Sequence, residues 1–324
     1  MLRRPLIHHT IGFGLALLFG GGLALGCGAA LAGIPALLEA VTPHPGVARL
    51  SIPDGFAESR SKPQLLYPVA AKPRPDWLVE AMRAAKVGAP PHLRGSQPVI
   101  AICIDDLGVD LAGTDKAMAL PKEVALSFLP FADTTPFLAE AAARSGHLVL
   151  AHVPMQPLNG ADPGPNSLKP GMTAEEVSRR LGWNLARVPG LVGINNHEGS
   201  RFTADAALLS PVMATLRARH LFFFDSRTSA QTEVAQAARA AGVMTAARDV
   251  FLDDDPQAAA VSAQLERLVG EAKRTGVAIA IGHPHDVTLK LLAQWLAQDH
   301  GVTLVPLDEA IRLKRERAVA LAAR

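Results

Sequence analysis

The sequence predicts an α/β domain over residues 98–324, with the fold of a distorted or incomplete (β/α) barrel of seven to eight strands. Apolar, β-branched runs of strand length alternate there with longer segments of helical periodicity. Fully apolar strands that alternate with helices indicate a parallel sheet covered by helices. About 225 residues holding seven or eight such units match the size of a (β/α) barrel. A doubly wound open sheet accounts for the same alternation and remains the alternative.

Each expected element follows from its local pattern. The apolar runs predict eight strands, at residues 99–104, 124–129, 148–153, 191–194, 221–224, 243–246, 277–281 and 302–305. The segments between them predict six helices, at residues 136–145, 173–187, 204–219, 232–241, 256–274 and 289–298. Thr173, followed three residues later by Glu176, is a capping-box pattern and predicts the start of the second helix.

An uncharged segment precedes this domain. Residues 11–38 form 28 consecutive positions without a charge, and about 20 apolar residues suffice to cross a membrane as a helix. Eight glycines argue against a buried helix of a water-soluble core. We therefore expect a transmembrane anchor, with a cleaved signal peptide as the alternative. Arg3 and Arg4 place residues 1–10 in the cytoplasm and the main domain on the periplasmic or extracytoplasmic side; cleavage would make the protein secreted.

Residues 39–97 have the composition of a linker. Ten prolines fall between positions 39 and 98, and no sustained apolar period appears there. Proline-rich segments of this kind form extended, semi-rigid spacers. The expected role is to hold the following domain away from the membrane.

Composition excludes several classes of protein. Charged residues make up 19% of the 324 positions, which is not the balance of a charged disordered tail. Residues 99–324 carry 22 Lys and Arg against 25 Asp and Glu, so a nucleic-acid partner is not expected. Two cysteines, Cys27 and Cys103, cannot build a disulfide scaffold, and Cys103 lies inside an expected strand as a buried thiol.

Titratable side chains follow five of the expected strands. Since the carboxyl ends of parallel strands meet on one face, these residues are expected to line one mouth. Histidine nitrogens and aspartate oxygens suit a divalent metal with an open position for water. The sequence contains no nucleophile elbow, P-loop or dinucleotide fingerprint. The residues at the strand ends are Asp105, Asp106, His152, Asn195, Asn196, His197, Glu198, Asp225, Arg227, His283 and His285.

Five motifs in this order resemble the divergent polysaccharide deacetylase family, a distant relative of the NodB-like carbohydrate deacetylases. They are residues 102–108 (ICIDDLG), 152–157 (HVPMQP), 193–203 (GINNHEGSRFT), 224–228 (FDSRT) and 281–285 (IGHPH). The resemblance covers residues 98–312. It implies a NodB-like distorted (β/α) barrel that removes N-acetyl groups from amino sugars with a divalent metal, often Zn²⁺.

The resemblance also implies roles for particular residues. By position in the family pattern, Asp105 corresponds to the general base and Asp106 to a metal ligand. The relatives' two histidine ligands, spaced four apart, are missing here, and His152 and His197 from two different strands resemble their replacements. His283 matches the general acid, and His285 shares that role or orients a neighbour. The expected substrate-binding or supporting residues are Asn195, Asn196, Asp225, Arg227 and His285.

Two further points concern departures from the pattern. Asp225, Ser226 and Arg227 occupy the place of the relatives' Arg-x-Pro-Tyr motif, which is absent here. Most family members have Met where Glu198 stands, so Glu198 is not expected to be essential.

Three functions remain open from the sequence. The first is a metal-dependent hydrolase acting on an N-acetylated cell-envelope polysaccharide. The second is a non-catalytic envelope module that binds glycan or protein through a degenerate deacetylase pocket, because two motifs of the relatives are absent. The third uses the same metal site to hydrolyse a different bond, such as an O-ester.

Overall fold

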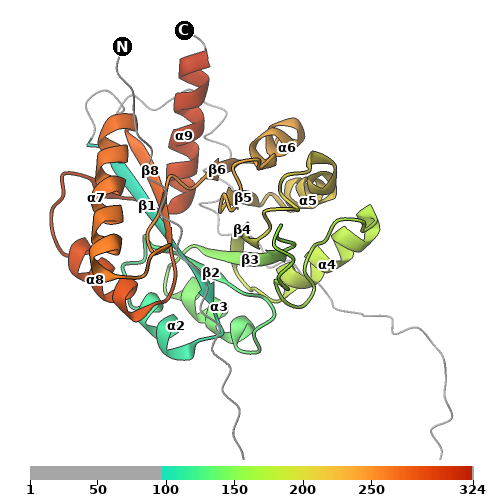
Figure 1. Cartoon of the computed structure of the whole chain (residues 1–324), viewed down its shortest axis with the longest axis horizontal. Coiled ribbons are helices and arrows are strands. Elements are labelled where there is room, and N and C mark those ends of the chain that lie inside the picture. Colours follow the sequence, from blue (N-terminus) through green and yellow to red (C-terminus); the bar gives the residue numbers. More distant parts are fainter. Residues whose placement is uncertain (1–96, 323–324) are drawn as a thin grey trace, which may run out of the picture. The chain divides into compact units, whose positions relative to one another are not determined.

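The protein folds around a curled sheet whose paired strands all run parallel (Figure 1). The computed structural model describes residues 97–322. Within that range the sheet has nine strands. They are β1 (Val99–Leu107), β2 (Ala125–Phe128), β3 (Val149–Met155), β4 (Leu191–Glu198), β5 (Phe222–Asp225), β6 (Thr245–Ala247), β7 (Val250–Phe251), β8 (Val277–Gly282) and β9 (Thr303–Leu304).

The strand order is that of a barrel opened at one seam. Neighbouring strands follow the order β6-β5-β4-β3-β2-β1-β8-β7, and β9 pairs with β1 outside this path. Strands that follow one another in the sequence therefore lie side by side, except β6 with β7 and β8 with β9. A doubly wound sheet would reverse its strand order at a switch point, and no such reversal occurs along this path. The expectation of an incomplete (β/α) barrel is therefore confirmed, and the doubly wound alternative is wrong.

The chain itself crosses the open seam. The backbone N–H of Arg248 donates to the carbonyl oxygen of Asp225 in β5, and the next N–H, of Asp249, donates to Ile279 in β8. Two adjacent residues thus bond to strands on opposite sides of the seam. One strand was expected in this region, at residues 243–246. The structure has two short strands instead, β6 before the crossing and β7 after it.

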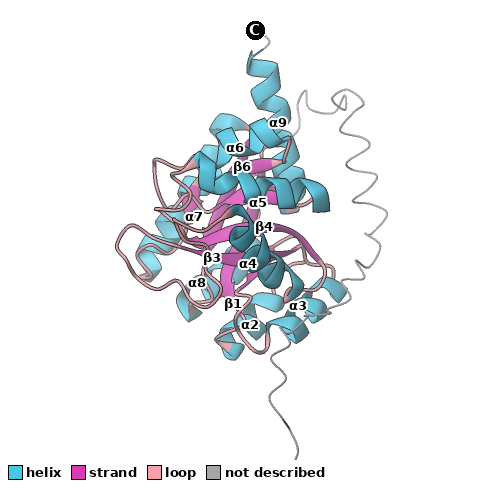
Figure 2. Ribbon diagram, turned by 90° about the vertical axis from the view of Figure 1, so that its right-hand side faces the viewer, coloured by secondary structure: helices cyan, strands magenta, loops and turns pink. Residues whose placement is uncertain are grey.

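Helices surround the curled sheet (Figures 1 and 2). All six expected helices are present, and Thr173 Oγ1 accepts the N–H of Glu176 as the capping pattern predicts. Two further helices, α2 and α9, were not expected from the sequence. The helices are α2 (Leu111–Met118), α3 (Thr135–Arg144), α4 (Ala174–Ala186), α5 (Ala206–Arg219), α6 (Val234–Ala241), α7 (Ala258–Thr275), α8 (Asp286–Leu296) and α9 (Leu307–Ala322).

Alternation along the strands produces two apolar cores. In β1, Ile100, Ile102 and Ile104 join the large core between the sheet and the helices. Ala101 and Cys103 point the other way, into a second core that includes Leu307 and other buried residues of α9. The interior of the curl is therefore filled by apolar side chains, and polar side chains collect at the carboxyl ends of the strands. Cys103 is buried, as expected.

The expected cytoplasmic segment 1–10, anchor 11–38 and linker up to residue 96 lie outside the described residues. Within residues 97–322, no helix is long and apolar enough to cross a membrane.

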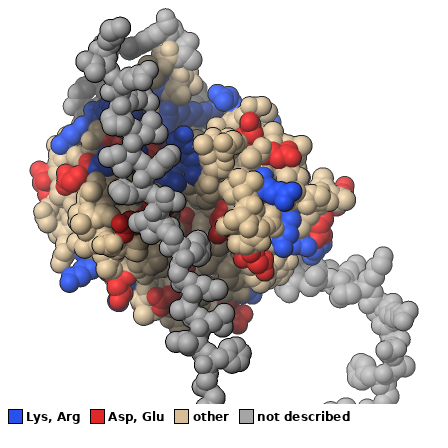
Figure 3. All heavy atoms as spheres, in the orientation of Figure 1, with Lys and Arg blue, Asp and Glu red and all other residues tan. Residues whose placement is uncertain are grey.

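On the face of this domain shown in Figure 3, positive and negative side chains are interspersed.

Candidate metal centre and active site

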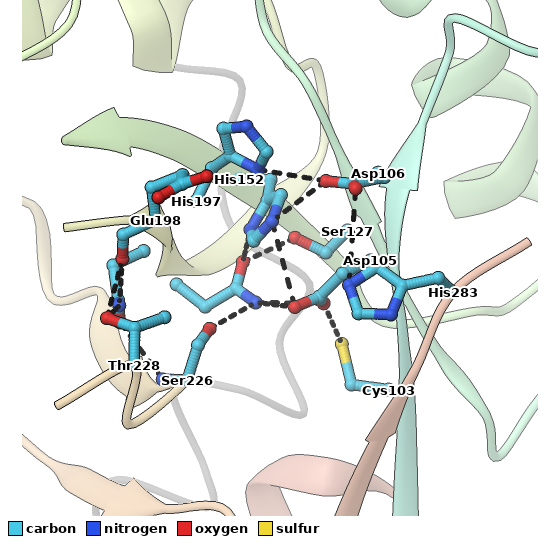
Figure 4. Close-up of polar contacts among 12 residues, drawn as sticks. Cys103, Asp105, Asp106, Ser127, His152, His197, Glu198, Ser226, Thr228 and His283 are labelled. Carbon is cyan, nitrogen blue, oxygen red and sulfur yellow. Dashed lines mark hydrogen bonds and ion pairs between the residues drawn. The ribbon is translucent and has the colours of Figure 1, made fainter. Parts of the chain in front are cut away.

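The ends of β1, β3, β4 and β8 bring one carboxylate and three imidazoles together (Figure 4). Asp106 is able to face the histidines because the register of β1 shifts between Ile104 and Leu107. Its φ is 58°, in the left-handed region. Glu198, at the end of β4, has a similar φ of 57°. Such backbone conformations are costly for non-glycine residues and cluster at functional sites.

Asp106, His152 and His197 form a group with the chemistry of a metal centre. Oδ1 of Asp106 lies 3.2 Å from Nε2 of His152 and 3.0 Å from Nδ1 of His197. Two ligand atoms at 2.0–2.1 Å from a tetrahedral zinc ion would be about 3.3 Å apart. Oδ1 is also buried without a hydrogen-bond partner. An orphaned carboxylate oxygen between two imidazoles fits a divalent cation.

Electrostatics keep Asp106 in the ionised form that a metal requires and favour positive charge beside it. Burial alone would raise the pKa of Asp106, but His152 and His197 hold it well below its usual range. Burial likewise would lower the pKa of His152, but Asp105 and Asp106 outweigh that effect and raise it. The carboxylate therefore stays ionised, and the acidic pair favours positive charge at this point.

Asp106, His152 and His197 are called the metal-type group below. Asp105 lies beneath this group in a buried hydrogen-bond network. Its two carboxylate oxygens each lie 2.8 Å from Nδ2 of Asn195, and the thiol of Cys103 donates to Oδ1. Oδ2 lies 3.8 Å from Nε2 of His152. Only 2% of the Asp105 side chain is exposed. Burial and the neighbouring Asp105 raise the pKa of the Cys103 thiol, so this cysteine stays protonated.

His283 reaches the site from the opposite side, at the end of β8. Its Nε2 lies 4.0 Å from Oδ2 of Asp106, and its Nδ1 bonds to Oδ1 of Asp253 at 2.9 Å. Burial would lower the pKa of His283, but the bond to Asp253, with Asp105 and Asp106 nearby, raises it to about 9. His283 is thus a cationic proton donor at neutral pH, aimed at the metal-type group.

Asp253 is a functional residue that the sequence analysis missed. Its Oδ2 also accepts from the His283 N–H at 2.7 Å and from Thr288 Oγ1 at 2.9 Å. The relevant pattern was present, because Asp253 follows the apolar residues of β7 in the same way that Asp105 follows an apolar run. The strand before Asp253 has only two residues, however, and so short a strand shows no apolar period from which it could be predicted.

Comparison with known proteins identifies the family of the chain. The profile described as divergent polysaccharide deacetylase matches residues 102–311. The chain belongs to this family.

Two relatives are known only as uncharacterised proteins. The chain is 38% identical over 203 residues to YibQ of Escherichia coli (strain K12) and 36% identical over 197 residues to a protein of Haemophilus influenzae. Each match covers 61% of this chain, with 64% of the first relative and 70% of the second. The chain thus matches less than two thirds of the length of the Escherichia coli relative.

A solved structure shares the fold. The crystal structure of an uncharacterised protein from Agrobacterium tumefaciens C58 has a TM-score of 0.63 and 30% identity to the chain. The similarity covers 68% of this chain and 91% of that one.

The remaining expected site residues of this family member hold loops in place. Asn196 links β4 to β5, because its Oδ1 accepts the Ser226 N–H and its Nδ2 donates to the Glu198 carbonyl. The Asp225 carboxylate accepts from the Arg227 N–H and from Thr232 within its own loop. Burial raises the pKa of Asp225 despite these bonds. These contacts fit the supporting part of the expectation for Asn196 and Asp225.

Arg227 and His285 lie at the periphery. The Arg227 side chain is exposed, at the left-handed position that the Asp225 turn creates, with a φ of 49°. His285 is exposed as well, and its ring centre lies 6.0 Å from that of His283. Asp253, His283 and His285 also approach one another as a possible ligand group. Both oxygens of Asp253 already accept hydrogen bonds, however, so Asp253 serves as a partner of His283.

Proposed function

We propose that the protein is a metal-dependent deacetylase that removes N-acetyl groups from a cell-envelope polysaccharide. The observation that carries this proposal is the group of Asp106, His152 and His197, with the cationic His283 facing it. Amide hydrolysis needs an activated water, relief of the charge that develops on the carbonyl oxygen, and a proton for the leaving nitrogen. Membership of the divergent polysaccharide deacetylase family supports a polysaccharide substrate.

The ligands proposed for a divalent metal, with Zn²⁺ as the best fit, are Asp106, His152 and His197. One carboxylate oxygen and two imidazole nitrogens form a common catalytic zinc set with an open position. When bound, such an ion lowers the pKa of a coordinated water and polarises a carbonyl. Side-chain exposures of 34% for Asp106 and 23% for His197 leave the group accessible to substrate.

Asp105 and His283 are the proposed base and acid. Oδ2 of Asp105 lies beside Nε2 of His152, which places a proton acceptor next to the proposed ligands. Water adds its oxygen to the acetyl carbon and gives a proton to Asp105. The C–N bond then breaks, acetate leaves, and His283 supplies the proton that the sugar amine needs. Asp253 keeps the Nδ1 atom of His283 bonded, so Nε2 is the atom that donates.

The compartment is also a proposal. The uncharged segment 11–38 and the proline-rich residues that follow support a domain tethered on the far side of the cytoplasmic membrane. A cell-envelope polysaccharide is the substrate within reach of an enzyme in that position.

One observation favours a binding module as the second candidate. The Asp105 side chain is almost fully buried, and both of its oxygens already lie against Asn195. A base in that position can take a proton only from a water that lies next to the proposed metal ligands. A chain that binds glycan without releasing acetate would fit this burial.

The test is acetate release from defined N-acetylated glycans by the full-length protein, with and without a chelator. Our proposal predicts release that stops with chelator and returns when Zn²⁺ is added. His283→Gln should abolish release while metal remains bound, whereas Asp106→Ala should lose both. Glycan retention without acetate release would favour the binding module. Release that resists both chelator and His283→Gln would contradict the proposed mechanism.

A further inference from the structure

The Asn195 side chain connects the residues of the buried hydrogen-bond network under the metal-type group. It lies in β4, and none of its surface is exposed. Its Oδ1 accepts from Ser127 Oγ and lies 2.8 Å from Nδ1 of His152. Its Nδ2 donates to the Asp105 carboxylate and lies 3.2 Å from Ser226 Oγ. One amide therefore joins a proposed metal ligand to the proposed base.

The neighbours of this amide allow only one orientation. A carboxylate accepts hydrogen bonds and donates none, so the group facing Asp105 must be the NH₂ of Asn195. The reverse orientation would place the amide oxygen 2.8 Å from both carboxylate oxygens, with three acceptors in contact and no proton among them. Asp105 thus determines that Oδ1 of Asn195 faces His152.

This orientation decides which nitrogen of His152 carries the proton. Since Oδ1 of Asn195 only accepts, Nδ1 of the neutral His152 ring must be the protonated atom. The lone pair is then on Nε2, the atom that lies 3.2 Å from Asp106. A metal-binding histidine needs a lone pair on the atom that faces the ion.

We propose that Asn195 is a positioning residue that presents Nε2 of His152 to the metal, with its own orientation set by Asp105. This inference rests on the proposed metal centre. It also narrows the expected role of Asn195, because the amide's two N–H groups and its oxygen are all engaged within the protein. Asn195 therefore does not bind a sugar hydroxyl.

Asn196 provides a matched control on the same strand. It is 1% exposed, and its amide also spans two strands. Its hydrogen-bond partners are backbone groups of Glu198 and Ser226 together with the Thr228 hydroxyl, and they include neither His152 nor Asp105. Replacing Asn196 therefore removes a buried amide but keeps the hydrogen bond between Asn195 and the proposed metal ligand His152.

The experiment measures Zn²⁺ affinity in the full-length protein, by competition with a chromophoric chelator, for wild type, Asn195→Leu and Asn196→Leu. Loss of a residue that orients a metal ligand typically weakens affinity about 10–100-fold. We expect a loss of that size for Asn195→Leu and a much smaller one for Asn196→Leu. Asn195→Ala, which leaves room for water, serves if the leucine variant does not fold.

A second readout needs no metal. In metal-free protein with ¹⁵N-labelled histidine, at a pH where the ring is neutral, His152 should carry its proton on Nδ1. The variants of Asn195 should shift this population toward Nε2–H. Wild-type His152 protonated on Nε2, or equal Zn²⁺ affinity in the Asn195 and Asn196 variants, would overturn the inference. Failure of the wild type to bind any divalent ion would instead overturn the proposed function.

Discussion

Replacing Asp253 by Asn should lower the pKa of His283. The substitution keeps the shape of the side chain but replaces the charged acceptor of the Nδ1–H bond by a neutral amide oxygen. In the folded protein the pKa of His283 is raised to about 9. Relative to an ordinary histidine value of about 6.5, this shift corresponds to roughly 3 kcal/mol in favour of the charged ring.

The size of the effect follows from the lost bond. A hydrogen bond to a charged group contributes about 1.5–3 kcal/mol, and 1.36 kcal/mol corresponds to one pKa unit. We therefore expect the pKa of His283 to fall by about one to two units, to about 7–8. Because the protonated ring is the proposed acid, acetate release should decline at a correspondingly lower pH in the variant.

Two assays measure this shift. An NMR titration of the His283 ring in metal-free protein gives the pKa directly, and denaturation as a function of pH gives its effect on stability. A histidine pKa raised by folding adds stability that is complete below about pH 6.5 and is lost as the pH rises through about 9. The difference in unfolding free energy between wild type and Asp253→Asn should therefore be large at pH 6 and smaller above pH 9.

Thr288→Val is the matched control for this variant. It removes the hydroxyl that donates to the other oxygen of Asp253 and keeps the carboxylate that faces His283. Its effect on the pKa of His283 should be small. The pKa of His283 could instead be unchanged in Asp253→Asn, or could change equally in both variants. Either result would refute the assignment of the raised pKa to the hydrogen bond between His283 and Asp253.

Three further predictions concern the metal centre and the sheet. Asp106→Asn should weaken Zn²⁺ binding in a metal titration while leaving the melting temperature of the metal-free protein nearly unchanged, since asparagine tolerates the φ of 58°. Zn²⁺ at a hundred times its dissociation constant should stabilise the wild type by about 2.7 kcal/mol, and His197→Ala should remove that gain in thermal melts. Gly193→Ala should cost about 1–3 kcal/mol in urea unfolding, because its Cβ would lie 2.5 Å from the Phe222 ring. An unperturbed stability in that last variant would contradict the packing of β4 against β5.

The alternation of apolar runs and helical segments was sufficient to predict the barrel, because each buried strand has no polar face to obscure it. The missed elements have physical explanations. The two residues of β7 cannot show a period, and their strand exists because the crossing at Arg248 and Asp249 delivers them to β8. α9 carries many charges, but Leu307, Ala310 and Ile311 have helical spacing and were a usable indication of its buried side.

The candidate site was predicted best where a residue ends a long strand. Asp106, His152 and His197 meet as that argument required, since parallel strands deliver their ends to one edge. Asp253 escaped because it follows the two-residue strand β7, which is too short to show a period. The orientation of Asp225 could not be predicted either, because it depends on a turn that bends its carboxylate back onto Arg227 and Thr232.

The most direct test of a metal centre at Asp106, His152 and His197 is anomalous X-ray diffraction at the zinc edge from crystals of the protein grown with Zn²⁺. We predict one strong peak in contact with Oδ1 of Asp106, Nε2 of His152 and Nδ1 of His197. A peak at Asp253, His283 and His285 instead, or no peak at the Asp106 group, would contradict the account.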